Sequence, residues 1–280
     1  MTDLTQSDPV PAITEQAATG AAAEIFADIR STLNVEVVNL VWRHLATMPG
    51  ALEWVWGSLK PLYLGSAITH AEYVRKNLAL PHTPPLSHDA LSAAGIDAVA
   101  LSSIRVILDS YQHTNALALV CFSAFLARFD RAAPTRAVVP PVGDESSYVP
   151  PNRVVLPRLI PIAEMPSPLA RLVHELNGFG EDSDPALVAS MYRHLAHWPA
   201  YLALIRTFLV PLHESGKLSS LVGATRHLGD EFGALIAGEI STTALRLEIE
   251  PILNAVRRFV RHPIARMTGV CALIRHATPR

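Results

Sequence analysis

Apolar residues recur at every third or fourth position along most of this 280-residue chain, which is the period of an amphipathic helix. The spacing is clear over residues 21–33. It continues through two long segments rich in Ala, Leu and Val, residues 101–129 and 242–277. Strand-like alternation bounded by turn dipeptides is nearly absent. The pattern therefore predicts an all-α fold.

The helical pattern occurs twice, at an offset of 150 residues. Without gaps, residues 34–62 align with residues 184–212, and ten of the 29 aligned positions are identical, among them the run Arg-His-Leu-Ala. The same offset aligns Cys121 with Cys271 in the last apolar segment of each half. We therefore expect an internal duplication, in which two helical repeats of one chain face each other as a pseudo-dimer.

Prolines mark the boundary between the two repeats. Nine of the 22 prolines fall between residues 134 and 168. Because proline has no N–H donor and a fixed φ, we expect this stretch to be extended and largely outside regular structure. The predicted organisation is a flexible N-terminus (residues 1–20), a first helical repeat (21–130), a Pro-rich linker (131–167) and a second helical repeat (168–280).

Composition narrows the class of protein. Half of the residues are apolar, enough for a large core, and a formal net charge of −2 leaves no basic footprint for nucleic acid. The longest apolar stretch, residues 116–127, is too short to span a bilayer, and the N-terminus lacks the apolar run of a signal peptide. The two cysteines are typical of core residues. We expect a cytoplasmic protein with no membrane partner, and the sequence leaves a homodimer open.

The duplicated helix is the best candidate for a pocket wall, because pockets form readily between facing helices. Its first copy carries His44 on one face with Val37 and Val41, and its second copy carries His194 on one face with Met191. The sequence leaves two roles open for these histidines. Each closes a hydrogen bond in the core, or the pair converges as acid–base groups or as ligands of a metal or haem.

Polar residues also interrupt the apolar segment 101–129. His113, Thr114 and Asn115 need hydrogen-bond partners there, so they form either a local network or part of a pocket lining. The chain has no P-loop, nucleophile elbow, paired CxxC or HExxH motif. No carboxylate or cysteine lies near the histidines at a standard ligand spacing, so the sequence signal for a metal site is weak.

Three stretches resemble the group I 2-haloacid dehalogenases, the enzymes that act on both enantiomers. They are ADIRSTLNVEVVNLVWRHLATMPGALEWVW (27–56), ASMYRHLAHWP (189–199) and, more weakly, RVILDSYQHTN (105–115). The resemblance implies a hydrolase built as an all-α pseudo-dimer, with its active site between the repeats and a small carboxylic acid as its ligand. It also implies direct attack of a water activated by an aspartate, with no covalent ester and no cofactor.

The chain departs from the family pattern at the central position. The pattern is Ala-Ser-Asp followed by an aromatic residue, and here Ser190 and Tyr192 match whereas Met191 replaces the aspartate. The family's asparagine falls at Thr114, with Asn115 next to it. An aromatic residue of the family's pocket falls at Val37.

Three hypotheses follow from the missing aspartate. His194 has replaced it as the general base, or the cavity serves another reaction, with acid–base chemistry, haem or a metal on His44 and His194, or the protein binds a ligand without turnover. We expect Ser190, Tyr192 and His194 to reach one cavity. The candidate catalytic residues are His194 and Ser190, and the candidate substrate-binding residues are Met191, Tyr192, Val37, Val41, His44, Thr114 and Asn115.

Overall fold

A computed structural model describes residues 10–130, 155–180, 187–241 and 248–280. Within these ranges the chain is helical and contains no β-strand, so the predicted all-α fold is confirmed. The elements are α1 (Gly20–Leu33), α2 (Leu40–Leu45), α3 (Ala51–Tyr63), α4 (Ala67–Asn77), α5 (His88–Ala93), α6 (Ala98–Phe129), α7 (Ser167–Gly178), α8 (Ser190–Leu195), α9 (Pro199–Glu214), α10 (Lys217–Ile236), α11 (Ile249–Phe259) and α12 (Ala265–Ala277), with short turns η2 (Ile162–Glu164), η3 (Ala237–Glu239) and η4 (Val260–Ile264).

Helix α6 is the centre of the molecule. It packs against α10, α12, α4 and α3, and every residue from His113 to Leu126 is buried. A helix that is apolar on all sides must be surrounded by others, which explains why its sequence lacks a clear polar face. The helix begins where the Asp97 carboxylate accepts a hydrogen bond of 2.8 Å from the Ala100 N–H.

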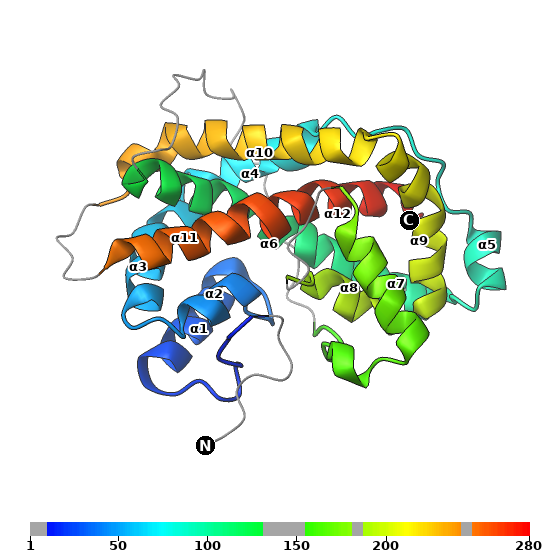
Figure 1. Cartoon of the computed structure of the whole chain (residues 1–280), viewed down its shortest axis with the longest axis horizontal. Helices are drawn as coiled ribbons and strands as arrows, with labels where there is room; N and C mark the ends of the chain where they lie inside the picture. The colour runs from blue at the N-terminus through cyan, green and yellow to red at the C-terminus, as the bar shows by residue number, and fades with distance from the viewer. Residues whose placement is uncertain (1–9, 131–154, 181–186, 242–247) are drawn as a thin grey trace.

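Two groups of shorter helices lie at opposite ends of the long ones. Figure 1 shows α1, α2 and α3 at one end and α7, α8 and α9 at the other, with α10, α11 and α12 spanning the distance between them. Helices α2 and α8 begin and end 150 residues apart, and α4 and α10 begin 150 residues apart. The offset of the sequence alignment therefore recurs in the helix boundaries.

The helix expected over residues 242–277 is divided in the structure. Residues 242–247 lie outside the described ranges, α11 begins at Ile249, and the turn η4 is a π-helix that contains Pro263. Proline removes one backbone donor and clashes with the preceding turn, and a widened turn accommodates both effects. Of the expected N-terminus and linker, residues 1–9 and 131–154 also lie outside the described ranges.

Two further expectations concern the cysteines and the membrane. Cys121 and Cys271 are both buried free thiols. Among the described helices, none is both long enough and apolar enough to cross a lipid bilayer.

Candidate functional site

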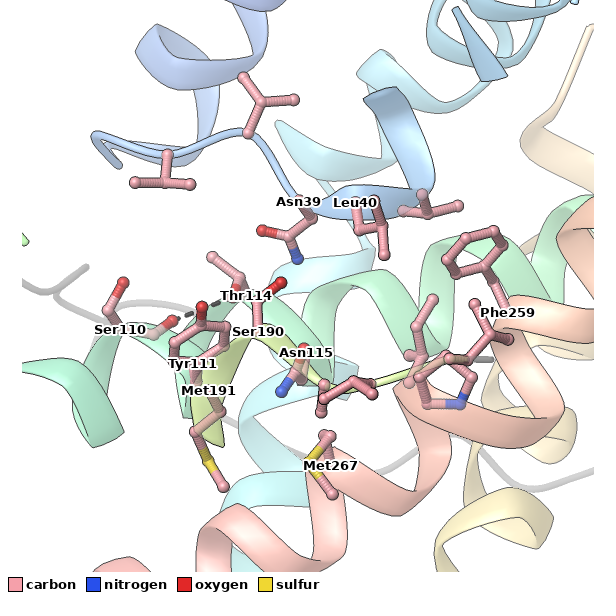
Figure 2. Close-up of a pocket in the computed structure, with 18 of the residues that line it drawn as sticks. Asn39, Leu40, Ser110, Tyr111, Thr114, Asn115, Ser190, Met191, Phe259 and Met267 are labelled. Atoms are coloured by element: carbon pink, nitrogen blue, oxygen red, sulfur yellow. Dashed lines mark hydrogen bonds between the residues drawn. The ribbon is translucent and has the colours of Figure 1, made fainter. Parts of the chain in front are cut away.

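A cavity of about 70 Å³ lies where the two end groups meet the long helices. A single water needs roughly 10–15 Å³ on this measure, so the cavity can hold a small organic molecule. Its lining comes from both halves of the chain (Figure 2): Val37, Val38, Asn39, Leu40, Val41, Ser110, Tyr111, Thr114, Asn115, Leu156, Leu187, Val188, Ala189, Ser190, Met191, Phe259, Pro263, Ile264 and Met267.

One wall of the cavity is polar. It is formed by one face of α6, where Ser110 and Thr114, and Tyr111 and Asn115, are four residues apart, and by Ser190 at the start of α8. The Thr114 hydroxyl donates to the Ser110 carbonyl over 3.0 Å. Among the described residues the buried Nδ2 of Asn115 has no hydrogen-bond partner. A buried amide without a partner is costly, so this group is available to a ligand.

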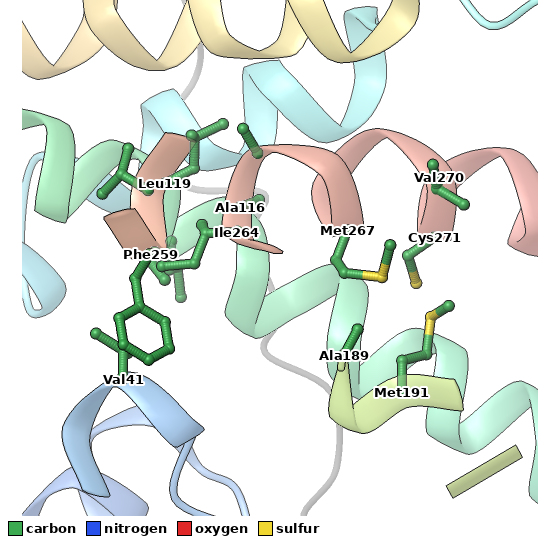
Figure 3. Close-up of a cluster of buried hydrophobic side chains, with 14 of the residues drawn as sticks. Val41, Ala116, Leu119, Ala189, Met191, Phe259, Ile264, Met267, Val270 and Cys271 are labelled. Carbon is green, nitrogen blue, oxygen red and sulfur yellow. The ribbon is translucent and has the colours of Figure 1, made fainter. Parts of the chain in front are cut away.

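A second part of the lining is apolar and includes two thioethers. Figure 3 shows Phe259, Ile264 and Met267 on the segment from α11 to α12, and Met191 on α8. Met191 is fully buried. The π-turn before α12 contributes Pro263 and Ile264 to this wall. Thioether sulfur is soft and polarisable, so this wall suits an apolar or polarisable substituent.

Tyr111 connects the cavity to a buried histidine. Its hydroxyl oxygen lies 2.8 Å from Nδ1 of His194, and the two ring centroids are 5.7 Å apart. His194 is 1% exposed. Burial, and then the nearby charges of Arg193, His197 and Arg43, lower the pKa of His194 to about 4. The imidazole is therefore neutral at pH 7, and its Nε2 has no hydrogen-bond partner among the described residues.

Two buried arginines make the potential near Tyr111 positive. Burial raises the pKa of Tyr111 above its ordinary value, whereas Arg193, Arg43 and a hydrogen bond with Ser190 act to lower that pKa. The Nε of Arg43 donates to the Val38 carbonyl, and the Nε of Arg193 donates to the Ile160 carbonyl. The two cations thus favour negative charge at the polar wall without themselves lining the cavity.

Six of the nine sequence candidates line the cavity, and they do so from both halves: Val37, Val41, Thr114, Asn115, Ser190 and Met191. Tyr192 and His194 are buried behind the cavity wall, because successive residues of α8 point in different directions around the helix axis. Of the three residues expected to share one cavity, Ser190 lines it, and His194 is linked to it through Tyr111.

The two matched histidines have separate environments. Nδ1 of His44 lies 2.7 Å from the Pro11 carbonyl, and its ring packs 5.4 Å from that of Phe259. His194 instead pairs with Tyr111. Across the described ranges, no group of three or more His, Cys, Asp or Glu side chains could hold a metal ion.

Sequence reasoning missed several lining residues, of which Tyr111 matters most. Ser110 and Tyr111 stand in the same stretch as the predicted Thr114 and Asn115, at the four-residue spacing that places side chains on one helix face. That spacing could have identified Ser110 and Tyr111 as lining residues. No sequence pattern could have identified Phe259, Pro263 and Met267, because their place in the lining depends on how α11 and α12 pack against α6.

The chain is similar to known dehalogenases in sequence and in fold. No protein-family model matches it. A stretch of 116 residues, 39% of this chain, is 28% identical to an (R)-2-haloacid dehalogenase of Pseudomonas putida, and it spans only 38% of that relative's length. The solved structures of a D-2-haloacid dehalogenase mutant with D-2-CPA and of a D-2-haloacid dehalogenase with L-LA each superpose with a TM-score of 0.66 at 16% identity, covering 95% of this chain and 94% of theirs. The chain is thus homologous to an (R)-2-haloacid dehalogenase and has the all-α fold of the D-2-haloacid dehalogenases.

Proposed function

We propose that this homologue of (R)-2-haloacid dehalogenase binds short 2-halocarboxylic acids in the cavity and hydrolyses them to 2-hydroxy acids by direct attack of water. The observation that carries the proposal is a cavity of about 70 Å³ with one polar wall and one apolar wall. A 2-haloacid has the same division, because its carboxylate and its halogen are attached to one carbon atom.

The substrate carboxylate is expected at the polar wall. The Asn115 amide offers a donor there, Ser190 and Thr114 offer hydroxyls, and the positive potential of Arg43 and Arg193 favours an anion. The halogen is expected at the apolar wall, near Met191 and Met267. A polarisable leaving group gains dispersion contacts with thioethers there.

The proton of the attacking water needs an acceptor, and His194 is our candidate. None of the residues known to line the cavity is a carboxylate, and the sequence resemblance implies that Met191 takes the place of the family's aspartate. With a pKa of about 4, neutral His194 is about as basic as an aspartate, whose ordinary pKa is about 3.9. A histidine of this strength can therefore take over the role of the carboxylate.

We also propose that the chain is a duplicated pseudo-dimer, with repeats at residues 21–130 and 168–280. The shared offset of α2 and α8 supports this, because the two helices bring matched segments to the cavity. Both walls then come from one chain, and the site needs no second copy. A homodimer and a cytoplasmic location stay predictions.

The test is halide release from D- and L-2-chloropropionate by the purified protein. We expect release from at least one enantiomer, with the D enantiomer preferred, because the named relatives act on R or D substrates. Asn115→Leu removes the free amide and should raise KM or abolish release. Asn77→Leu, at an exposed position on α4, is the matched control and should leave release unchanged. Absence of release from both enantiomers would rule out the proposed reaction.

A second candidate function is binding of a small carboxylic acid without turnover. It is favoured by the lack of any carboxylate or histidine among the residues known to line the cavity. Calorimetry separates the two functions, since saturable binding of 2-chloropropionate and lactate without halide release would support binding alone. The alternative of haem or a metal shared by His44 and His194 gains no support from the separate contacts of the two histidines.

A further inference from the structure

His194 does not line the cavity, so a base at this position needs a group that carries the proton to it. Among the residues of the polar wall, Tyr111 has both required contacts. It lines the cavity, and its hydroxyl oxygen is 2.8 Å from Nδ1 of His194. That distance is typical of a hydrogen bond that can transfer a proton.

We propose that Tyr111 is a catalytic residue, which takes the proton of the attacking water at its hydroxyl oxygen while its own proton passes to Nδ1 of His194. This inference rests on the proposed function and names the group through which that function operates.

The donors and acceptors are consistent with this direction of transfer. A phenol has one proton to donate and two lone pairs to accept with. Tyr111 donates its proton to His194, one lone pair accepts a hydrogen bond from Ser190, and the other is left for the water. His194 then carries its resting proton on Nε2. Ser190 is a positioning residue in this arrangement, because it holds the phenol oxygen toward the cavity.

The step balances without any further reagent. The water oxygen forms a bond to C2 as the bond between C2 and the halogen breaks, and the halide leaves with the electron pair. The water proton moves to Tyr111, and the Tyr111 proton moves to His194. The product is a 2-hydroxy acid, and the imidazolium afterwards returns its proton through the Tyr111 hydroxyl to water in the cavity.

The charges around His194 set the conditions of the relay. Arg193, His197 and Arg43 surround it, in addition to Tyr111. Burial and the two arginines disfavour a lasting imidazolium, so His194 is neutral and ready to accept at neutral pH, and it loses the proton quickly afterwards. The two arginines also stabilise the negative charge that develops on Tyr111 in the transition state.

A purely structural tyrosine–histidine contact is the competing explanation. It accounts for the bond between Tyr111 and His194, and it leaves Nε2 of His194 without a partner among the described residues, as the relay also does. The two explanations differ in kinetics, because only the relay makes the loss of either side chain lower kcat.

The experiment measures halide release by Tyr111→Phe, by His194→Gln and by the double variant. Loss of a general base lowers the rate roughly 10²–10⁴-fold, and we expect a loss in this range in kcat for each single variant, with KM nearly unchanged. The double variant should lose no more than the worse single variant, because both substitutions interrupt one relay.

Two matched controls lie away from the cavity lining. Tyr201→Phe removes a buried tyrosine hydroxyl that bonds to Thr278 over 2.7 Å. His113→Gln removes a buried histidine whose pKa is likewise lowered to about 4. Both controls should keep kcat within about threefold, whereas a general packing defect would reduce them to the same extent as the relay variants.

A second readout does not depend on turnover. We expect the nitrogen-15 NMR signals of His194 to report a neutral ring protonated on Nε2, and Tyr111→Phe should shift the Nδ1 signal. The inference is overturned if wild-type protein releases halide and Tyr111→Phe keeps its kcat, or if the effects of the two variants multiply. Wild-type protein without halide release overturns the proposed function, and the relay with it. If Tyr111→Phe does not fold, the kcat of His194→Gln against His113→Gln decides.

Discussion

The sequence resemblance to the dehalogenases predicts an aspartate at the position that Met191 occupies. Its side chain is fully buried and lines the cavity beside Ser190. A thioether accepts protons too weakly to activate water. If the remaining wall still suits a 2-haloacid, a carboxylate at this position should supply a second base.

We therefore expect Met191→Asp to raise the rate of halide release by about 10-fold or more, within the usual contribution of a general base. Burial will raise the pKa of the new carboxyl, so the gain should appear only above that pKa. Met267→Asp, on the facing α12, is the control and should give no gain. Halide electrode assays across pH test this, and equal rates in the two folded variants would contradict it.

The buried histidines make stability depend on pH. The pKa values of His113 and His194 are both lowered to about 4 in the folded protein, from an ordinary value of 6.5. The unfolded chain therefore binds more protons between these values, and stability that is complete above pH 6.5 falls as the pH drops toward 4. For each histidine, the free energy of unfolding should fall by about 2 kcal/mol when the pH is lowered from 7.5 to 5.

Urea denaturation at the two pH values measures this loss. His113→Gln should remove the contribution of His113 to this pH dependence without touching the relay. A free energy of unfolding that is equal at pH 7.5 and pH 5 would show that the two histidines are not buried in neutral form.

Only some of the residues that line the cavity could be predicted from the sequence. Thr114 and Asn115 could be singled out because polar side chains within an apolar helix need partners. Tyr111 stood in the same stretch, but an aromatic residue in a helix is usually a core residue, and its bond to His194 joins residues 83 positions apart. Contacts of that kind depend on tertiary packing, which no local pattern encodes.

At the scale of elements, α6 and α10 approach each other closely at two glycines of α10. A Cβ atom added at Gly233 would lie 2.6 Å from the backbone nitrogen of Ala124, and one added at Gly229 would lie 2.7 Å from the side chain of Leu119. Such distances are too short for any side chain, so the glycines set the separation of the two helices.

We expect Gly233→Ala to destabilise the protein by about 1–3 kcal/mol or more, the usual range for overpacking. The matched control is Gly223→Ala on the same helix, where an added Cβ meets nothing within 4 Å. That change should be stabilising by about 0.5–1 kcal/mol, because alanine favours a helix more than glycine does. Urea midpoints of the two variants test the contrast, and a neutral Gly233→Ala would contradict it.

The helices themselves were largely predictable. The expected segments 21–33 and 101–129 correspond to α1 and α6, and α6 begins three residues earlier because Asp97 caps it. The division of the last long segment into α11, η4 and α12 was missed, although Pro263 marks the place. Periodicity reports which residues are apolar, and it is insensitive to one widened turn.

At the scale of the whole molecule, the two halves share one core. The buried stretch of α6 packs on α10 and α12, which belong to the second half. Separating the halves would expose this apolar surface to water, at roughly 25 cal/mol for each Å².

We therefore expect residues 1–150 and 151–280, expressed separately, to lack a cooperative thermal transition, whereas the full chain should unfold in a single step. Circular dichroism and the dispersion of amide NMR signals check this. A sharp melting transition in either isolated half would show that it has a core of its own.

The cavity is lined by two segments that match position by position, residues 37–41 and 187–191. In a homodimer with a symmetric site, every substitution would be installed twice. Here Val41 and Met191 are encoded separately, so one segment can change while the other keeps its sequence. A library that randomises only residues 187–191 would thus explore new ligands while residues 37–41 stay constant, and the chain is a natural scaffold for one-sided redesign.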